Sequence, residues 1–182
     1  HAMQLEFQAA GQSLQLQARA KPMADWPLAG LQASLKNFDL AALHPEWPRT
    51  ALSGALSLDA QQWERPADLK IQLGNALGGP WDQQRLPVAR LQADLQFAPA
   101  HWQSVQIRSL ELSLSDAHGQ AAGGLKVQGQ LSPEQASDLQ LRLDGLRLDA
   151  LHSQLLALAV DGQLHLRRAA QAAASKPGDK AR

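Results

Sequence analysis

The sequence predicts an all-β fold, an elongated and curled sheet of mostly antiparallel strands. Apolar and polar residues alternate along most of the 182 residues, the alternation slips by one residue at three places, and one segment recurs 108 positions later without a gap. The alternation predicts the strands, the slips predict the curvature, and the recurrence predicts an elongated, stacked architecture.

An alternation of period two is typical of a strand with one buried face. It is strict over 14–20, 68–73, 89–97, 110–115, 125–131 and 139–144, and about ten strands are expected in all. Leu and Gln, the abundant residues here, are not strong strand formers. In "LQADLQF" (91–97), however, the four apolar residues lie two apart, and a helix would scatter them around its circumference. The period therefore outweighs intrinsic preference.

Two segments, 148–159 and 167–176, are compatible with short helices. The segment that corresponds to the first of these in the earlier copy contains Pro45 and Pro48, which exclude a long helix there. We expect one or two helical turns at most.

The alternation changes phase at Asn37, at Gly145, and between Ile107 and Leu110. A slip of one residue sends side chains to the opposite face unless a β-bulge absorbs it. Asn and Gly tolerate the left-handed backbone that such a bulge can use. Because bulges bend strands, these slips predict a strongly curved sheet.

The recurrence relates residues 31–58 to residues 139–166, with 11 identities in 28 positions, among them His44 with His152 and Gly54 with Gly162. It predicts a repeat-built β domain over 4–166 that is a fragment of a longer array. The opening His-Ala-Met, residues 1–3, is typical of a cloning scar. Residues 167–182 form a basic, Ala-rich tail, expected to be frayed or disordered.

Two units carry a resemblance to a known family: "NFDLAALHPEWPRTALSGALSLDA" (37–60) and "LGNALGGPWDQQRLPVARLQADLQF" (73–97). They resemble the β-rich repeats of the TamB family, within the AsmA-like group of bacterial envelope proteins. The resemblance covers roughly residues 31–166. The second copy departs from it, because Ser153 and Leu156 stand where the first copy has proline.

This resemblance implies a periplasmic protein, anchored in the inner membrane, with a β-taco-like sheet whose concave face is a hydrophobic groove. It also implies a role in carrying phospholipid acyl chains to the outer membrane. The alternative it implies is a scaffold or chaperone for the assembly of outer-membrane β-barrel proteins, including autotransporters, with TamA as the barrel partner.

The alternation itself makes a separate physical demand, because no long amphipathic helix is available to cover the apolar face. Either the sheet closes on itself as a sandwich or barrel, or it keeps an open apolar trough. The expected groove-lining residues are Leu56, Leu58, Leu69, Ile71, Leu73, Leu91, Leu95, Phe97, Leu112, Leu114, Val127, Leu141, Leu143, Leu164 and Leu166. In a closed fold the same residues are an ordinary core.

Several chemistries are disfavoured by composition and spacing. The chain has no Cys and a formal net charge of zero, so neither thiolate chemistry nor nucleic-acid binding is expected. His44 and His152 have no second His or carboxylate at ligand-like spacing, and we interpret them as turn or strand-end residues. No nucleophile motif and no phosphate-binding loop is present, so no catalytic residue, metal or cofactor is expected. The basic residues of the tail could touch anionic headgroups but are interpreted as a soluble end.

Overall fold

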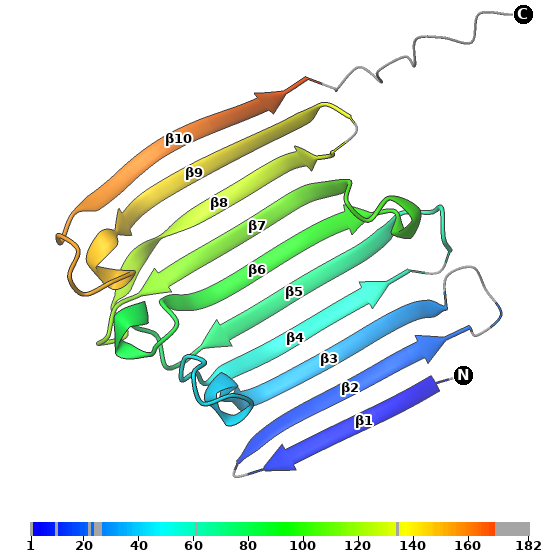
Figure 1. The fold of residues 1–182 in the computed structure, drawn as a ribbon, viewed down its shortest axis with the longest axis horizontal. Coiled ribbons are helices and arrows are strands. Elements are labelled where there is room, and N and C mark those ends of the chain that lie inside the picture. The colour runs from blue at the N-terminus through cyan, green and yellow to red at the C-terminus, as the bar shows by residue number, and fades with distance from the viewer. Residues whose placement is uncertain are drawn as a thin grey trace, which may run out of the picture.

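A computed structural model describes residues 2–9, 11–21, 23, 27–60, 62–133 and 135–169 (Figure 1). Within these residues ten strands form one sheet, in which every strand pairs antiparallel with its neighbours in the chain. The strands are β1 (Ala2–Ala9), β2 (Gln12–Ala20), β3 (Leu28–Phe38), β4 (Leu52–Asp59), β5 (Ala67–Asn75), β6 (Val88–Phe97), β7 (Val105–Ser115), β8 (Ala121–Leu131), β9 (Ser137–Arg147) and β10 (Ala159–Arg168). The all-β, antiparallel prediction is confirmed.

The only helices among the described residues are four single 3₁₀ turns, all of them in connections between strands. They are η1 (Leu40–Ala42), η2 (Trp81–Gln83), η3 (Pro99–His101) and η4 (Leu148–Ala150). The expectation of at most a turn or two at 148–159 is met by η4. The other segment, 167–176, begins as the end of β10, and its remainder from residue 170 lies outside the described residues.

The predicted strong curl is wrong: the ten strands form an open meander that is neither closed nor strongly curled. The bulges expected to bend it are present, with register shifts between Leu35 and Phe38, between Ile107 and Leu110, and between Val160 and Gly162. The first and third lie next to connecting loops, so they bend strand ends. Only the shift in β7 lies in mid-strand, and one such bulge does not roll up ten strands.

Asn37 and Gly145 occupy the same left-handed conformation, with φ of 49° and 55°. Each backbone N–H donates to a side chain of the next strand, Asn37 to Ser53 Oγ at 2.9 Å and Gly145 to Asp161 Oδ1 at 2.6 Å. The two donors and the two acceptors are each 108 residues apart. The sequence repeat is therefore also a repeat of local geometry.

Replacement of Asn37 by valine is expected to lower the free energy of unfolding by about 1 to 3 kcal/mol, because a β-branched residue is strained at positive φ. Replacement by glycine, the residue at the equivalent position 145, is expected to be neutral or slightly stabilising. Urea denaturation of both variants measures the difference. An equal loss for valine and glycine would show that the conformation at residue 37 is not the constraint.

The predicted domain limits differ slightly from the strand limits. Ala2 and Met3, assigned to the cloning scar, pair with Arg19 and Ala18 as part of β1. Arg167 and Arg168, assigned to the tail, are the last two residues of β10. The remainder of the predicted frayed tail, from residue 170, lies outside the described residues.

Candidate functional site

The register of the sheet aligns apolar side chains into rows that cross it at right angles to the strands. Residues directly opposite each other on paired strands share a face. One such row, here called the central row, has one apolar residue from every strand: Leu5, Leu16, Ala33, Leu56, Ile71, Ala93, Leu110, Val127, Leu141 and Leu164.

Two further rows flank the central row on the same face. The row toward η1, η2 and η4 contains Leu14, Leu35, Gly54, Leu73, Leu91, Leu112, Leu125, Leu143 and Gly162. The row on the other side contains Met3, Ala18, Leu31, Leu58, Leu69, Leu95, Ile107, Gly129, Leu139 and Leu166. Together the three rows make up what we call the apolar face.

All fifteen residues expected to line a groove lie on this face. Thirteen belong to the three rows, and Phe97 and Leu114 extend the face at opposite strand ends, beside Val105 and Val88. The same rows contain further apolar residues that were not among those expected to line a groove: Met3, Leu5, Leu14, Leu16, Leu31, Leu35, Ile107, Leu110, Leu125 and Leu139. Their alternation was visible in the sequence, but only the cross-strand register shows that they join the same surface.

The apolar face is only half-buried. Among the described residues nine hydrophobic side chains are buried, and seven of them are alanines, so the leucines are not sealed in a core. At the two sheet edges the face is more open still, with Leu5 60% and Leu164 53% exposed. Ten strands and three rows span about 43 Å by about 20 Å, or about 900 Å². The largest apolar patch of a typical monomer is about 300–600 Å².

The opposite face is polar and solvent-exposed. One polar row crosses all ten strands, with Ala55 its only apolar member: Glu6, Gln15, Ser34, Ala55, Gln72, Gln92, Glu111, Lys126, Arg142 and Gln163. Its contacts are weak, as in the Lys126–Glu111 pair at 3.9 Å, and exposed pairs of this kind contribute about 0–1 kcal/mol. A hollow of about 710 Å³ lies over β7 to β10. Eight of its twelve lining residues are polar, and the other four, Leu110, Val127, Leu141 and Leu164, belong to the central row.

The connections at one end of the strands form a continuous border, here called the loop wall, made of residues 39–51, 76–87, 116–120 and 148–158. The Trp81 N–H donates to the Leu151 carbonyl at 3.0 Å, and the Arg49 N–H donates to the Gln84 carbonyl at 2.8 Å. Ala150 is buried in a cluster with Leu114, and Leu151 packs against this cluster. The loop wall therefore covers one end of the apolar face.

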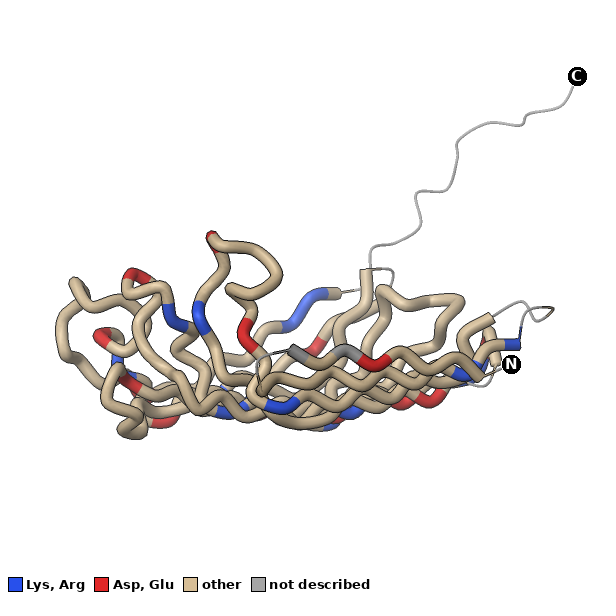
Figure 2. The backbone as a smooth tube through the Cα atoms, turned by 90° about the horizontal axis from the view of Figure 1, so that it is seen from below, with Lys and Arg blue, Asp and Glu red and all other residues tan. Residues whose placement is uncertain are grey.

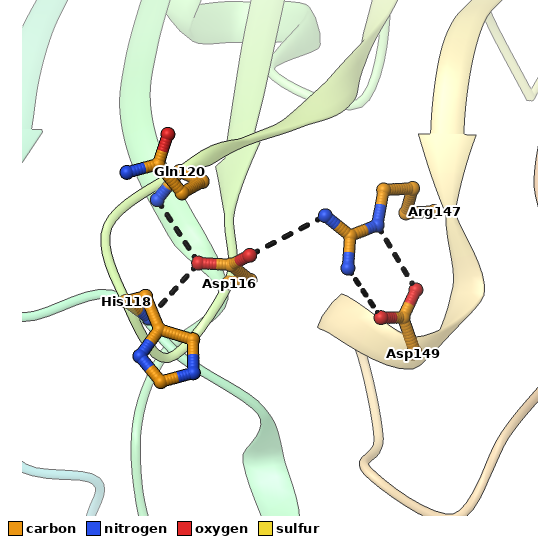
Figure 3. Close-up of polar contacts among 5 residues, drawn as sticks. All are labelled: Asp116, His118, Gln120, Arg147 and Asp149. Carbon is orange, nitrogen blue, oxygen red and sulfur yellow. Dashed lines mark hydrogen bonds and ion pairs between the residues drawn. The ribbon is translucent and has the colours of Figure 1, made fainter. Parts of the chain in front are cut away.

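Arg147 is the main ionic link of the loop wall (Figure 3). Its guanidinium lies 2.5 Å from Asp149 Oδ2 and 3.3 Å from Asp116 Oδ2, and hydrogen bonding to Asp149 raises the pKa of Arg147. Asp116 also accepts from the backbone N–H groups of Gln120 and His118, both at 2.9 Å. These bonds, that from Gln120 most, hold the pKa of Asp116 below its usual value. The short β7–β8 turn is thereby tied to the start of η4.

A second link joins the β5–β6 and β9–β10 connections through Asp82. Its carboxylate accepts from the Ser153 hydroxyl and from the Ser153 N–H, the latter at 2.8 Å. The Ser153 hydroxyl, followed by the Ser153 N–H, lowers the pKa of Asp82. A carboxyl whose pKa is lower in the folded state stabilises it at neutral pH, and loses this effect as the pH falls through the folded pKa.

We therefore expect the protection of the Ser153 amide from hydrogen exchange, corrected for its intrinsic rate, to be constant from pH 7 to 5. Below about pH 4 it should fall, as Asp82 is protonated. The matched variant Asp82→Asn keeps an acceptor oxygen but cannot titrate, and its Ser153 protection should show no acid transition. The same transition in Asp82→Asn would assign it to other carboxyls of the loop wall.

The recurring histidines are turn residues in both copies. His44 Nδ1 accepts from the Glu46 N–H and His152 Nδ1 accepts from the Gln154 N–H, both at 3.3 Å. In each case the residue follows a 3₁₀ turn, and its own N–H approaches the first carbonyl of that turn. This confirms their interpretation as turn residues.

Across the part of the chain that the structure describes, no three His, Asp or Glu side chains are grouped so as to hold a metal. No helix in the same ranges has the length and hydropathy needed to cross a membrane.

Comparison with known proteins returns no relative. No family model, no curated protein and no solved structure matches this chain.

Proposed function

We propose that this chain is a non-catalytic segment of a TamB-like envelope protein, and that its apolar face carries or shields phospholipid acyl chains on their way to the outer membrane. The observation that supports this most is the central row, ten apolar residues long and without a polar interruption. An acyl chain of about 16 carbons gains about 0.8 kcal/mol per buried methylene, or about 13 kcal/mol gross.

In this proposal the loop wall forms one border of a concave hydrophobic groove, and the connections at the opposite strand ends form the other. The polar face meets the periplasm, and the complete protein is anchored in the inner membrane. A surface that must accept and release lipid has to remain accessible. The leucines of the three rows are half-buried and therefore partly accessible.

Photo-crosslinking tests the proposal at neighbouring positions on opposite faces. A photo-reactive amino acid at Leu112 or Leu91 lies on the apolar face, and one at Glu111 or Gln92 lies on the polar face of the same two strands. We expect phospholipid adducts in cells from Leu112, Leu91 and Leu95, and none from Glu111 or Gln92. Adducts confined to the polar positions would contradict the proposal.

A second candidate is favoured by the sheet edges. β1 pairs only with β2, and β10 pairs only with β9, so each leaves one side of its backbone unpaired among the described strands. Such edges can accept an added strand, as a scaffold for outer-membrane β-barrel proteins with a TamA-like partner would require. A photo-reactive amino acid in β10, the edge strand, tests this second function. Crosslinks from it to unfolded barrel protein, without lipid adducts at Leu112, would favour the second function.

A further inference from the structure

Tryptophan is concentrated at the two ends of the strands. Five of the eight aromatic residues are Trp and none is Tyr. The four described ones are all in loops: Trp47 and Trp81 in the loop wall, and Trp63 and Trp102 in the connections at the opposite strand ends. Their exposed fractions are 48%, 58%, 39% and 66%. We call these four residues the Trp rim.

The backbone beneath the Trp rim is well anchored, although the indoles are exposed. On one side the Trp81 N–H is bonded to the Leu151 carbonyl. On the other side the Trp63 carbonyl accepts from the Ala100 N–H at 3.0 Å, and the adjacent Pro99 is fully buried. The indoles are therefore held at the border of the sheet by ordered loops.

Connections between the strands rise on one side of the sheet (Figure 2). The contacts of Ala150 and Leu151 with Leu112 and Leu114 identify that side as the apolar face. Exposed indoles thus lie at both ends of the strands, at the borders of the half-buried apolar face. An amphipathic indole ring is stabilised where hydrocarbon meets water, as at the headgroup level of a bilayer.

The charged residues in the four connections that carry the Trp rim indicate which lipid headgroups the rim can bind. The connections that carry Trp63 and Trp81 each contain one acid and one base, Glu64 with Arg65 and Asp82 with Arg85. The connection 39–51 contains Arg49 and two acids, Asp39 and Glu46. The fourth, 98–104, contains no Asp, Glu, Lys or Arg. With four acids and three bases, the four connections carry a net charge of −1. They have no excess of cations with which to select anionic headgroups, and this favours zwitterionic ones.

A second copy of the chain fits this surface less well. Two sheets packed face to face lie about 10 Å apart. The loops that rise on the apolar side of both copies would have to fit into that gap.

We propose that the Trp rim and the apolar face dock this protein onto the surface of a zwitterionic phospholipid bilayer. This inference does not depend on acyl-chain carriage, because a protein can dock on a bilayer without extracting lipid from it. The indoles would lie at the headgroup boundary, with the leucine rows toward the hydrocarbon.

The test uses the full chain with vesicles of phosphatidylcholine alone. We expect binding with a blue shift of Trp emission, and quenching by lipids brominated near the headgroups. The double substitution Trp81→Ala with Trp102→Ala removes the most exposed indole at each end of the strands. It should weaken vesicle binding about tenfold or more. The matched control Gln83→Ala with Gln103→Ala changes exposed residues of the same two loops and should bind like the unmodified chain.

Three results would overturn the docking proposal. The first is binding only to vesicles with anionic lipid, lost at high salt, which would assign the contact to the basic end of the chain. The second is equal binding by the Trp and Gln variants. The third is dimerisation in sedimentation velocity that the Trp substitutions abolish, which would assign the rim to a second copy. If the Trp variant no longer binds vesicles but still co-purifies with phospholipid, the docking test and the carriage test have given separate answers. The two proposals can therefore fail separately.

Discussion

Replacement of Gly54 by alanine is expected to lower the free energy of unfolding by about 2 to 5 kcal/mol, while the same change at Gly162 leaves it within about 0.5 kcal/mol. Gly54 has φ of 150°, and a Cβ added there would lie 2.0 Å from the Gln72 carbonyl oxygen of β5. Gly162 occupies the same place in the second copy of the repeat, but an added Cβ there meets nothing within 4 Å. The difference arises because β4 has a strand on either side, whereas β10 is an edge among the described strands.

Urea unfolding of Gly54→Ala and Gly162→Ala, compared at equal m-values, measures this difference. A small effect at both positions would mean that β4 and β5 separate easily enough to admit a methyl group. A large effect at Gly162 would mean that β10 has another strand against it in solution, which would contradict the open edge.

The combined substitutions Ile71→Asp and Val127→Asp are expected to abolish phospholipid binding while the protein remains folded. Both residues lie in the central row and are half-buried, three strands apart. Because no described element covers them, each substitution should lower the free energy of unfolding by about 1–2 kcal/mol, whereas comparable changes in a closed core lower it by about 3–5 kcal/mol. An uncompensated carboxylate beside an acyl chain is far more costly to the complex.

Lipid extraction and mass spectrometry measure the bound phospholipid, and thermal melts measure folding. The matched control places aspartate at Gln72 and Gln128, next to the same two residues on the polar face. It should retain lipid. Loss of lipid in this control as well would indicate that the apolar face is not the lipid surface. Unfolding of the Ile71/Val127 variant would indicate that the leucine rows are a structural core.

The strands and faces were predictable because a period of two defines both at once. The alternation in "LQADLQF" placed Leu91 and Leu95 on one face whatever the final curvature, and β6 has this arrangement. The phase slips at Asn37 and Gly145 were equally informative, since each required a bulge and both positions have positive φ. Alternation cannot report how far a sheet rolls, because curvature depends on where along each strand the bulges lie. The strong curl was therefore wrong.

The loop wall was not predictable from the sequence. The contact between the β5–β6 and β9–β10 connections joins Asp82 to Ser153, which are 71 residues apart. The two connections can meet because the β7–β8 turn that lies between them, at 116–120, is short and does not separate them. The Trp rim was missed for a related reason, since isolated tryptophans in turns carry no period, and only the alignment of strand ends brings them to common borders.

The order of the strands has a consequence for how the molecule assembles. Among the described strands, each is hydrogen-bonded only to the strands before and after it in the chain, as in a linear array of coupled units. Loop closures are short, so the chain can fold by successive addition of hairpins, and contacts between distant parts of the chain do not limit the rate. Under tension applied at its two ends, such a ribbon would peel from β1 or from β10, strand by strand, and the interior strands would be the last to lose their partners.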